Sequence, residues 1–391
     1  MNDDVVAIVI GRHTEKPLTE GGGIIARQTA KAISRVGFPT WLISINYSKG
    51  IESREIEISG ENAGNEIPLK IKFLFQDDVL NDHRVAVLSN LVEFAATPLM
   101  LVKLIKKLRK NYRNLYVFIV NANKLVGAVL AYLSKHFSSR VTKVYVLTQR
   151  EELYRETLRI IKPDIILATS KELQLLAFKS ATLDVTNILF TYPPILDEPK
   201  SRLESERYRN KELILLYLGR VNEKRFPIVF FKNIAKKLKE SKEELKLIIA
   251  TPPEKPSIFW LLKAKNIVEE FNLADRVIFV PRILREHEKN MLLRKASIFI
   301  YPSITTAAVE PPLSVLEAMS YGQYLITTGS TSTRELVIQT LGFISKDFSD
   351  LNLNSSIYIS NQARDIILSW SRTNLSITMF MKTIKSIMDT N

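Results

Sequence analysis

The chain has 391 residues, 46% of them hydrophobic and 25% charged, so it is long enough for two globular domains and too apolar for a disordered protein. It contains no cysteine, which excludes disulfides, thiolate metal sites and cysteine nucleophiles and is typical of a reducing compartment. The formal net charge of +14 favours binding of phosphorylated ligands, anionic lipids or nucleic acids without choosing among them.

The start of the chain is acidic, and its apolar run Val5–Ile10 is too short for a signal core or a membrane span. No other apolar run reaches the length of a membrane helix. We therefore expect a cytoplasmic protein, either soluble or peripheral on the inner face of the membrane.

Short β-branched runs alternate with longer helical patterns along the chain, which is the rhythm of βα units. In the first half the predicted strands are Val5–Ile10, Thr40–Ile45, Ile71–Phe75, Tyr116–Val120, Val144–Leu147, Ile165–Thr169 and Ile188–Thr191. In the second half they are Leu213–Leu218, Leu245–Ala250, Val277–Val280, Ile298–Tyr301 and Tyr324–Thr327. A polar stretch from Asp197 to Glu212 separates the two series.

This pattern predicts an α/β fold of two doubly wound parallel-sheet, Rossmann-like domains. The first domain spans residues 1–196, residues 197–212 form a linker, and the second domain spans residues 213–370. A C-terminal helix at 371–391 is expected to pack back towards the first domain. Ligands of such folds bind beyond the carboxyl ends of the strands, so we expect the site in a cleft between the domains.

A glycine run, Gly21-Gly22-Gly23, ends the loop between the first predicted strand and a helix with Ile25 and Ile33 on one face. Backbone N–H groups of glycines at a helix start can approach an anion closely, aided by the helix dipole. The glycines are therefore candidates for phosphate contact. A flexible connection is the competing interpretation.

A matching feature follows the first strand of the second domain, where the chain reads Gly219-Arg220-Val221-Asn222-Glu223-Lys224. A guanidinium can fork onto phosphate oxygens and an ammonium supplies a compact charge, so Arg220 and Lys224 suit a leaving diphosphate. The alternative is a solvated basic loop in an already basic protein.

Two carboxylates flank a predicted helix start in the segment that begins at Glu310 and continues PPLSVLEAMSYG. Glu310 is expected in the loop, facing the cleft. Glu317 is expected in the first helical turn, where a carboxylate can accept hydrogen bonds from the vicinal hydroxyls of a ribose. Ser314 and Glu317 also fit a capping box, in which Glu317 only satisfies a backbone N–H.

Taken together, the Gly219–Lys224 loop, the Pro302-Ser303 strand end and the EPPLSVLEAMSYG segment resemble the donor domain of the family 4 retaining glycosyltransferases, which have the GT-B fold. The resemblance covers most of residues 213–340 and, more loosely, residues 1–190. Several features differ from the family pattern. Six rather than seven residues separate Glu310 from Glu317, and Asn121-Ala122-Asn123 and Gln149-Arg150 stand where the family often has histidine. Tyr192-Pro193-Pro194 replaces the usual asparagine-glycine turn that closes the first domain, and Thr251-Pro252-Pro253 replaces the glycine-rich turn after the second strand of the donor domain.

The resemblance implies a role for each matching residue. Arg220 and Lys224 would hold the diphosphate, Glu317 the ribose hydroxyls and Glu310 the hydroxyls of the transferred sugar. The backbone of Gly21–Gly23 would reach the phosphates from the other domain, and the base would stack near Arg282. Such enzymes need no metal ion, and the four scattered histidines form no metal cluster in the sequence.

Residues Leu99–Arg113 combine six basic side chains, no acidic ones and apolar residues at helical spacing. This pattern predicts a basic amphipathic helix, which could lie on an anionic membrane surface or simply pack its apolar face on the sheet. Nucleic acid is not expected as a partner, because no aromatic-basic RNA motif accompanies it.

The sequence therefore predicts a metal-independent, hexosyltransferase-like glycosyltransferase (EC 2.4) that moves a sugar from a nucleoside-diphosphate sugar to a glycan, a lipid-linked acceptor or another acceptor. Two alternatives stay open. One is a catalytically silent GT-B protein that binds a nucleotide or a carbohydrate, and the other is a nucleotide-sugar epimerase or hydrolase.

Overall fold

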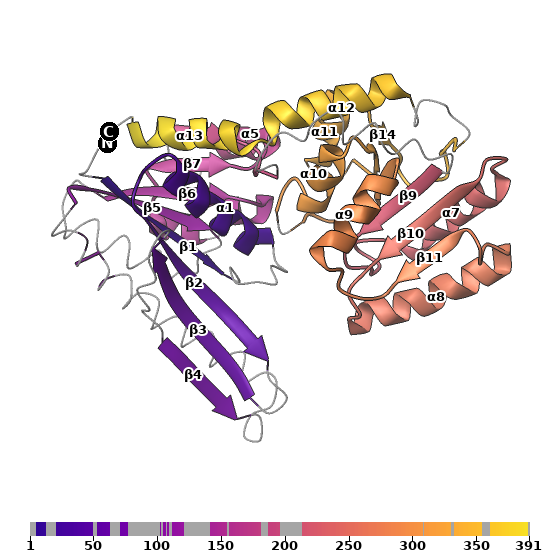
Figure 1. Ribbon diagram of the computed structural model, residues 1–391, viewed down its shortest axis with the longest axis horizontal. Coiled ribbons are helices and arrows are strands. Elements are labelled where there is room, and N and C mark those ends of the chain that lie inside the picture. The colour runs from indigo at the N-terminus through magenta and orange to yellow at the C-terminus, as the bar shows by residue number, and fades with distance from the viewer. Residues whose placement is uncertain are drawn as a thin grey trace. The chain divides into compact units, whose positions relative to one another are not determined.

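The computed structural model divides into two compact units (Figure 1), residues Met1–Pro193 with Thr378–Asn391 and residues Pro194–Ile377. The structure describes residues 5–12, 21–49, 53–62, 71–76, 102, 105, 106, 108, 112–120, 141–154, 156–180, 187–195, 213–307, 309–329, 332–353 and 360–389. The unit boundary falls three residues before the predicted end of the first domain.

The first unit is built on a sheet with eight strands among the described residues. In spatial order these are β4 (Ile71–Gln76), β3 (Ser53–Asn62), β2 (Thr40–Lys49), β1 (Val5–Arg12), β5 (Asn114–Val120), β6 (Val141–Leu147), β7 (Ile165–Ala168) and β8 (Asn187–Phe190). The six strands from β2 to β8 pair in parallel. Every strand predicted in this half is present.

The edge of this sheet differs from the prediction, because β3 pairs antiparallel with β2 and β4 pairs antiparallel with β3. The sequence of β3, SREIEISGEN, alternates polar and apolar residues and lacks the apolar run expected of a buried parallel strand. Its pattern is typical of an antiparallel edge, and we did not predict a strand there.

The helix α1 (Gly21–Arg35) follows β1 and begins at the first of the three glycines. The glycines thus lie in its first turn, not in the loop before it. Ile25 and Ile33 are buried, as their spacing predicts, and Gly37 closes the helix with a φ of 99°.

The other helices whose bounds lie within the described residues of the first unit are short, apart from the C-terminal one. They are the 3₁₀ helix η2 (Arg150–Tyr154), α4 (Glu156–Ile161), α5 (Lys171–Lys179) and α13 (Ile377–Asp389). The core of the unit brings together Ile8, Val117, Ile119 and Leu158. The helix α13 belongs to this unit, and the Tyr116 hydroxyl of β5 donates a hydrogen bond to the Met388 carbonyl at 3.2 Å.

The second unit has six parallel strands among its described residues. In spatial order they are β11 (Val277–Val280), β10 (Leu245–Ala250), β9 (Leu213–Leu218), β12 (Ile298–Tyr301), β13 (Tyr324–Thr327) and β14 (Phe343–Ile344). The five predicted strands have the predicted bounds, and β14 is an addition. The expected class of two doubly wound α/β domains is confirmed.

Helices connect these strands and cover the sheet (Figure 1). They are α7 (Ile228–Glu240), α8 (Lys255–Phe271), α9 (Glu286–Lys295), α10 (Leu313–Ser320), α11 (Thr333–Thr340) and α12 (Asn361–Asn374). α7 packs against α8, and α12 packs against α10 and α11. Because all six strands are parallel, the loops that follow them lie at the same edge of the sheet. Arg220, Lys224, Arg282 and Glu310 lie in these loops.

The packing of α13 can be tested at Ile384, whose side chain is fully buried. We expect Ile384→Ala to lower the free energy of unfolding by about 2–4 kcal/mol, because it leaves a cavity in the core. Lys385→Ala changes the next residue, which is exposed, and should stay within about 0.5 kcal/mol of the wild type. Equal urea midpoints for the two variants would contradict this packing.

Candidate functional site

The strand order of the second unit has a switch point between β9 and β12. From β9 the chain proceeds to β10 and β11 on one side of the sheet, and from β12 to β13 and β14 on the other. The loops that follow β9 and β12 therefore diverge, and such a switch point is where open α/β sheets bind ligands. The two loops are joined there by the Ile304 N–H, which donates to the Lys224 carbonyl at 3.0 Å.

The loop after β9, residues 219–226, is anchored to a buried aromatic cluster of the second unit. The Phe226 ring lies 5.0 Å from Tyr217 and 5.1 Å from Trp260. The Trp260 indole N–H donates to the Phe226 carbonyl at 2.5 Å, and the Tyr217 hydroxyl donates to the Arg220 carbonyl at 2.7 Å. Both ends of the loop are thus fixed to the core of the unit.

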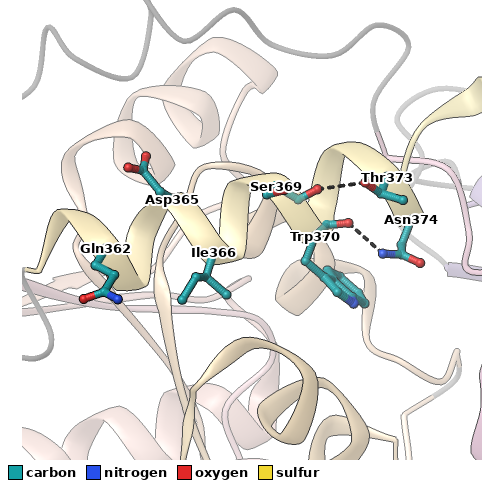
Figure 2. Close-up of a pocket in the computed structure, with 7 residues that line it drawn as sticks. All are labelled: Gln362, Asp365, Ile366, Ser369, Trp370, Thr373 and Asn374. Carbon is teal, nitrogen blue, oxygen red and sulfur yellow. Dashed lines mark hydrogen bonds between the residues drawn. The ribbon is translucent and has the colours of Figure 1, made fainter.

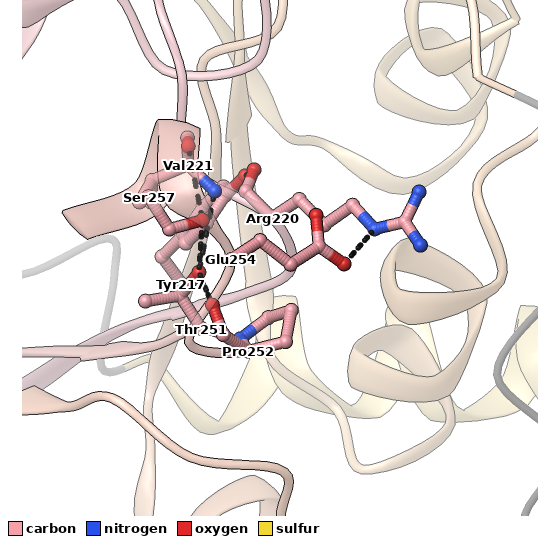
Figure 3. A network of polar contacts seen from close by, with 7 residues as sticks. All are labelled: Tyr217, Arg220, Val221, Thr251, Pro252, Glu254 and Ser257. Carbon is pink, nitrogen blue, oxygen red and sulfur yellow. Dashed lines mark hydrogen bonds and ion pairs between the residues drawn. The ribbon is translucent and has the colours of Figure 1, made fainter. Parts of the chain in front are cut away.

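The same loop is tied to the start of α8 (Figure 3). The Val221 N–H donates to Thr251 Oγ1 at 3.3 Å, and the Ser257 hydroxyl donates to the Val221 carbonyl at 3.2 Å. Thr251 begins the Thr251-Pro252-Pro253 turn that follows β10. A hydroxyl at this position provides a hydrogen-bond acceptor that glycine lacks.

Arg220 and Lys224 both lie at the surface, as candidate anion ligands must. The Nε of Arg220 pairs with Glu254 at 2.9 Å, an exposed contact of small energy, and the terminal nitrogens of its guanidinium point away from Glu254 (Figure 3). Lys224 is exposed, and its backbone N–H donates to Asn222 Oδ1 at 2.9 Å. Glu254 therefore orients Arg220 without occupying its outer edge.

The loop after β12 carries a buried polar group around the Tyr301 hydroxyl. Arg225 Nη1 donates to this hydroxyl at 3.2 Å. Burial raises the pKa of Tyr301 against the opposing effect of the Arg225 guanidinium, and the carboxylate of Glu310 adds to the rise. Arg225 and Glu310 thus both act on the Tyr301 hydroxyl at the end of β12.

Glu310 itself is fully buried. This differs from the expected loop carboxylate that faces a cleft. Its side chain lies beneath the surface at the end of β12 and so would reach a sugar only if the loop that carries it moved. The assignment of Glu310 to the sugar hydroxyls stays a prediction.

Glu317 is not a capping residue. α10 begins at Leu313 with Pro312 as its N-cap and no side-chain cap hydrogen bond, so Glu317 lies in the second turn. The capping-box interpretation of Ser314 and Glu317 is wrong, because Pro311 and Pro312 place the helix start before Ser314. The Glu317 carboxylate accepts instead from Lys289 Nζ of α9 at 2.9 Å.

Lys289 is largely buried between α9 and α10 and serves two carboxylates. Besides Glu317 it contacts Glu286 at 3.2 Å. Burial alone would lower the pKa of Lys289, but the two carboxylates outweigh that effect and the net pKa is raised. Lys289 therefore stays charged, and it fixes the position of the carboxylate predicted to hold a ribose.

Arg282, the residue expected near the base, is held by Glu288 of α9. Two parallel contacts of 2.7 Å join the guanidinium to this carboxylate. They lower the pKa of Glu288 to about 2, with help from the Arg285 N–H, which also donates to it. The planar face of a guanidinium fixed in this way is suited to stacking on a base.

Three other predictions fall partly or wholly outside what the second unit or the described residues can show. The helix start at Gly21–Gly23 belongs to the first unit, and its contact with a phosphate stays a prediction. Residues Asn121-Ala122-Asn123 lie outside the described residues, as do most of Leu99–Arg113. Of that segment, Ile105 and Leu108 are buried in the core and Lys106 is exposed, so the described part of its apolar face packs inside the protein.

Among the described residues, no three histidine, aspartate or glutamate side chains gather as a metal site would require. None of the helices in the described ranges has the length and apolarity needed to cross a membrane.

A separate hollow of about 780 Å³ runs along α12 (Figure 2). Its described lining residues are Gln362, Asp365, Ile366, Ser369, Trp370, Thr373 and Asn374. None of the predicted site residues is among them, and neither is any lysine or arginine. The lining therefore has no cation to hold a diphosphate.

Sequence reasoning missed Glu254, Arg225, Tyr301 and Lys289. Arg225 adjoins Lys224 in the basic loop, so charge alone could have indicated it. Tyr301 was predicted only as the last residue of a strand. Lys289 pairs with a residue 28 positions away, and no short motif carries such a contact.

Comparison with known proteins gives a family for the second unit. Residues 200–357 match the model of the family described as glycosyl transferases group 1. No curated protein sequence matches the chain. The match covers most of the second unit and less than half of the chain.

Solved structures resemble nearly the whole chain. A glycosyltransferase from Rickettsia africae is 12% identical, with a TM-score of 0.65 over 99% of this chain and 98% of that one. Anabaena HepE in complex with UDP is 11% identical, with a TM-score of 0.65 over 99% and 100%. Sucrose-phosphate synthase from Thermosynechococcus elongatus is 14% identical, with a TM-score of 0.60 over 98% of each chain. At these identities the likeness shows the fold, two Rossmann-like domains of the GT-B class.

The ion pair at Glu317 can be tested by a double-mutant cycle with Lys289→Gln and Glu317→Gln. Because both side chains are about three-quarters buried, we expect a coupling energy of about 1 kcal/mol in urea unfolding. Ser314→Ala should change the free energy of unfolding by less than about 0.5 kcal/mol, whereas loss of a cap costs about 1 kcal/mol. A costly Ser314→Ala together with no coupling would restore the capping box.

Proposed function

We propose that this chain, whose residues 200–357 match the glycosyl transferases group 1 family, is a retaining glycosyltransferase. It would move a sugar from a nucleoside-diphosphate sugar to a glycan, a lipid-linked acceptor or another acceptor without a metal ion. The observation that carries the proposal is the meeting of the loops after β9 and β12, which places Arg220 and Lys224 at the switch point of the sheet.

The proposed donor lies along this edge in a defined order. Arg220 and Lys224 bind the diphosphate, Glu317 accepts from the ribose hydroxyls, and the base lies towards Arg282. HepE was solved with UDP and with UDP-glucose, which supports a nucleotide-sugar donor for a protein of this fold. From the first unit, the backbone N–H groups of Gly21–Gly23 would add a second phosphate contact.

In the proposed transfer the bond from the anomeric carbon to the diphosphate oxygen breaks, and the acceptor oxygen forms a bond to that carbon on the same face. The acceptor proton passes to the departing phosphate oxygen, so no protein base is required. The chain supplies positioning and two cations that neutralise the leaving diphosphate. Arg220 and Lys224 therefore matter more to this step than any histidine.

One observation favours a second candidate, a GT-B protein that binds a nucleotide sugar without turnover. Glu310 is fully buried, so the carboxylate assigned to the transferred sugar does not line the surface. Incubation of the purified protein with a bound nucleotide sugar separates the two candidates, because only an enzyme releases the nucleoside diphosphate.

The diphosphate contact is tested by the double variant Arg220→Ala/Lys224→Ala. Loss of two charge-assisted contacts should cost roughly 3 kcal/mol, a fall of more than about a hundredfold in affinity. The measurement is a thermal-shift and calorimetric screen of uridine, guanosine and adenosine diphosphates in the presence of a chelator. If the wild-type protein bound the nucleoside diphosphate only when a divalent cation was present, metal independence would be contradicted.

The matched control is Lys242→Ala/Lys295→Ala. It removes the same charge from exposed positions that precede β10 and β12, at the opposite edge of the sheet. Its affinity should equal that of the wild type. Equal losses in both double variants would mean that net charge alone attracts the nucleotide.

The two carboxylates should differ in what their loss affects. We expect Glu317→Gln to weaken nucleoside-diphosphate binding about tenfold and to abolish any preference for ribose over 2′-deoxyribose, because it removes an acceptor for the hydroxyls. Glu310→Gln should leave that affinity unchanged and lower kcat. If the ratio of affinities for the ribose and 2′-deoxyribose nucleotides is the same in Glu317→Gln as in the wild type, Glu317 does not hold the ribose.

A further inference from the structure

The helix α8 presents an apolar stripe to solvent that no part of the proposed reaction uses. Ile258, Phe259 and Leu262 are 48%, 69% and 55% exposed and lie within two turns of one another. At helical spacing the three side chains share one face. The opposite face, with Trp260, Leu261 and Ala264, is buried in the unit.

Lysines border this stripe on both sides. At 100° per residue, Lys263 and Lys265 fall on its two flanks and Lys255 precedes it. All three are exposed, and residues 255–268 contain no acidic side chain. Within the described residues, the one carboxylate contact of these lysines joins Lys263 to Glu223 at 3.7 Å, an exposed pair that phosphate groups can replace.

We propose that this face of α8 binds the surface of an anionic phospholipid bilayer, with Phe259 and Leu262 inserted between headgroups and the lysines on lipid phosphates. A helix with an apolar stripe flanked by lysines lies in the plane of the interface, and its apolar residues and charges contribute together. The +14 net charge of the chain adds attraction over the distance that salt allows.

The structure favours α8 over the basic segment Leu99–Arg113 as the membrane contact. Ile105 and Leu108 of that segment are buried in the core. The segment can therefore bring basic side chains to a membrane surface, but it cannot insert these two apolar side chains. α8 offers both.

The absence of cysteine in the chain permits a direct test with a single labelled residue. A Leu262→Cys variant would carry an environment-sensitive fluorophore and be mixed with vesicles of phosphatidylcholine, with or without phosphatidylglycerol. We expect a blue shift and a rise in intensity only with the anionic vesicles. The control is Ile338→Cys on α11, which is 72% exposed and should show no shift.

Sedimentation with the same vesicles separates the apolar and charged parts. Phe259→Ser/Leu262→Ser should reduce the bound fraction about tenfold at low salt, because transfer of two apolar side chains is lost. Lys255→Gln/Lys263→Gln/Lys265→Gln should reduce binding at low salt and leave little difference from the wild type at high salt. Ile338→Ser is the matched control, and thermal unfolding verifies that each variant is folded.

Three results would overturn the proposal. The first is a wild type that fails to bind anionic vesicles at low salt. The second is binding that is lost in Lys103→Gln/Lys106→Gln/Lys107→Gln but kept in Phe259→Ser/Leu262→Ser, which would assign the contact to the first unit. The third is a dimer in light scattering that Phe259→Ser/Leu262→Ser dissociates, which would make the stripe an interface between copies of this chain.

Discussion

The loop that follows β9 depends on one buried contact, the packing of Phe226 between Tyr217 and Trp260. A short loop that carries exposed cations would otherwise sample many conformations, and each conformation lost on binding would cost affinity. Here the Trp260 indole and the Tyr217 hydroxyl hold its two ends at the carbonyls of Phe226 and Arg220. The backbone that presents Arg220 and Lys224 is therefore set before any ligand arrives.

Oppositely charged neighbours hold several of the candidate ligand groups in place. Glu254 pairs with the Nε of Arg220, and Lys289 donates a hydrogen bond to the Glu317 carboxylate. Glu288 accepts hydrogen bonds from both terminal nitrogens of the Arg282 guanidinium. The first and third pairs are exposed, so solvent screens them and their value lies in orientation more than in stability. The pair of Lys289 and Glu317 is more buried and joins α9 to α10, so it links the position of a proposed ligand group to the packing of two helices.

Much of the fold was predictable because parallel strands buried on both faces leave continuous apolar runs in the sequence. For this reason the five predicted strands of the second unit have the same first and last residues as the observed strands. β3 was missed because its alternating pattern does not form such a run. Glu317 was predicted correctly as part of the helix after β12, but the helix start was placed too late, because Pro312 is its N-cap.

The charged residues of the candidate site were predictable from the sequence, but the side chains that pair with them were less so. Arg220, Lys224 and Glu317 follow from a local motif, whereas Glu254 and Lys289 meet them through tertiary packing. The burial of Glu310 also could not be read from a motif. Buried carboxylates differ from exposed ones by what surrounds them in the fold, and Glu310 acts on Tyr301 at the end of β12.

The central claim is that the loops after β9 and β12 bind a nucleoside diphosphate without a metal ion. Hydrogen exchange by mass spectrometry, with and without saturating nucleoside diphosphate in a chelating buffer, tests it most directly. The account predicts that protection on binding gathers in residues 219–226 and 302–317. Protection confined to α12 and its hollow, or to the first unit with these loops unchanged, would contradict it.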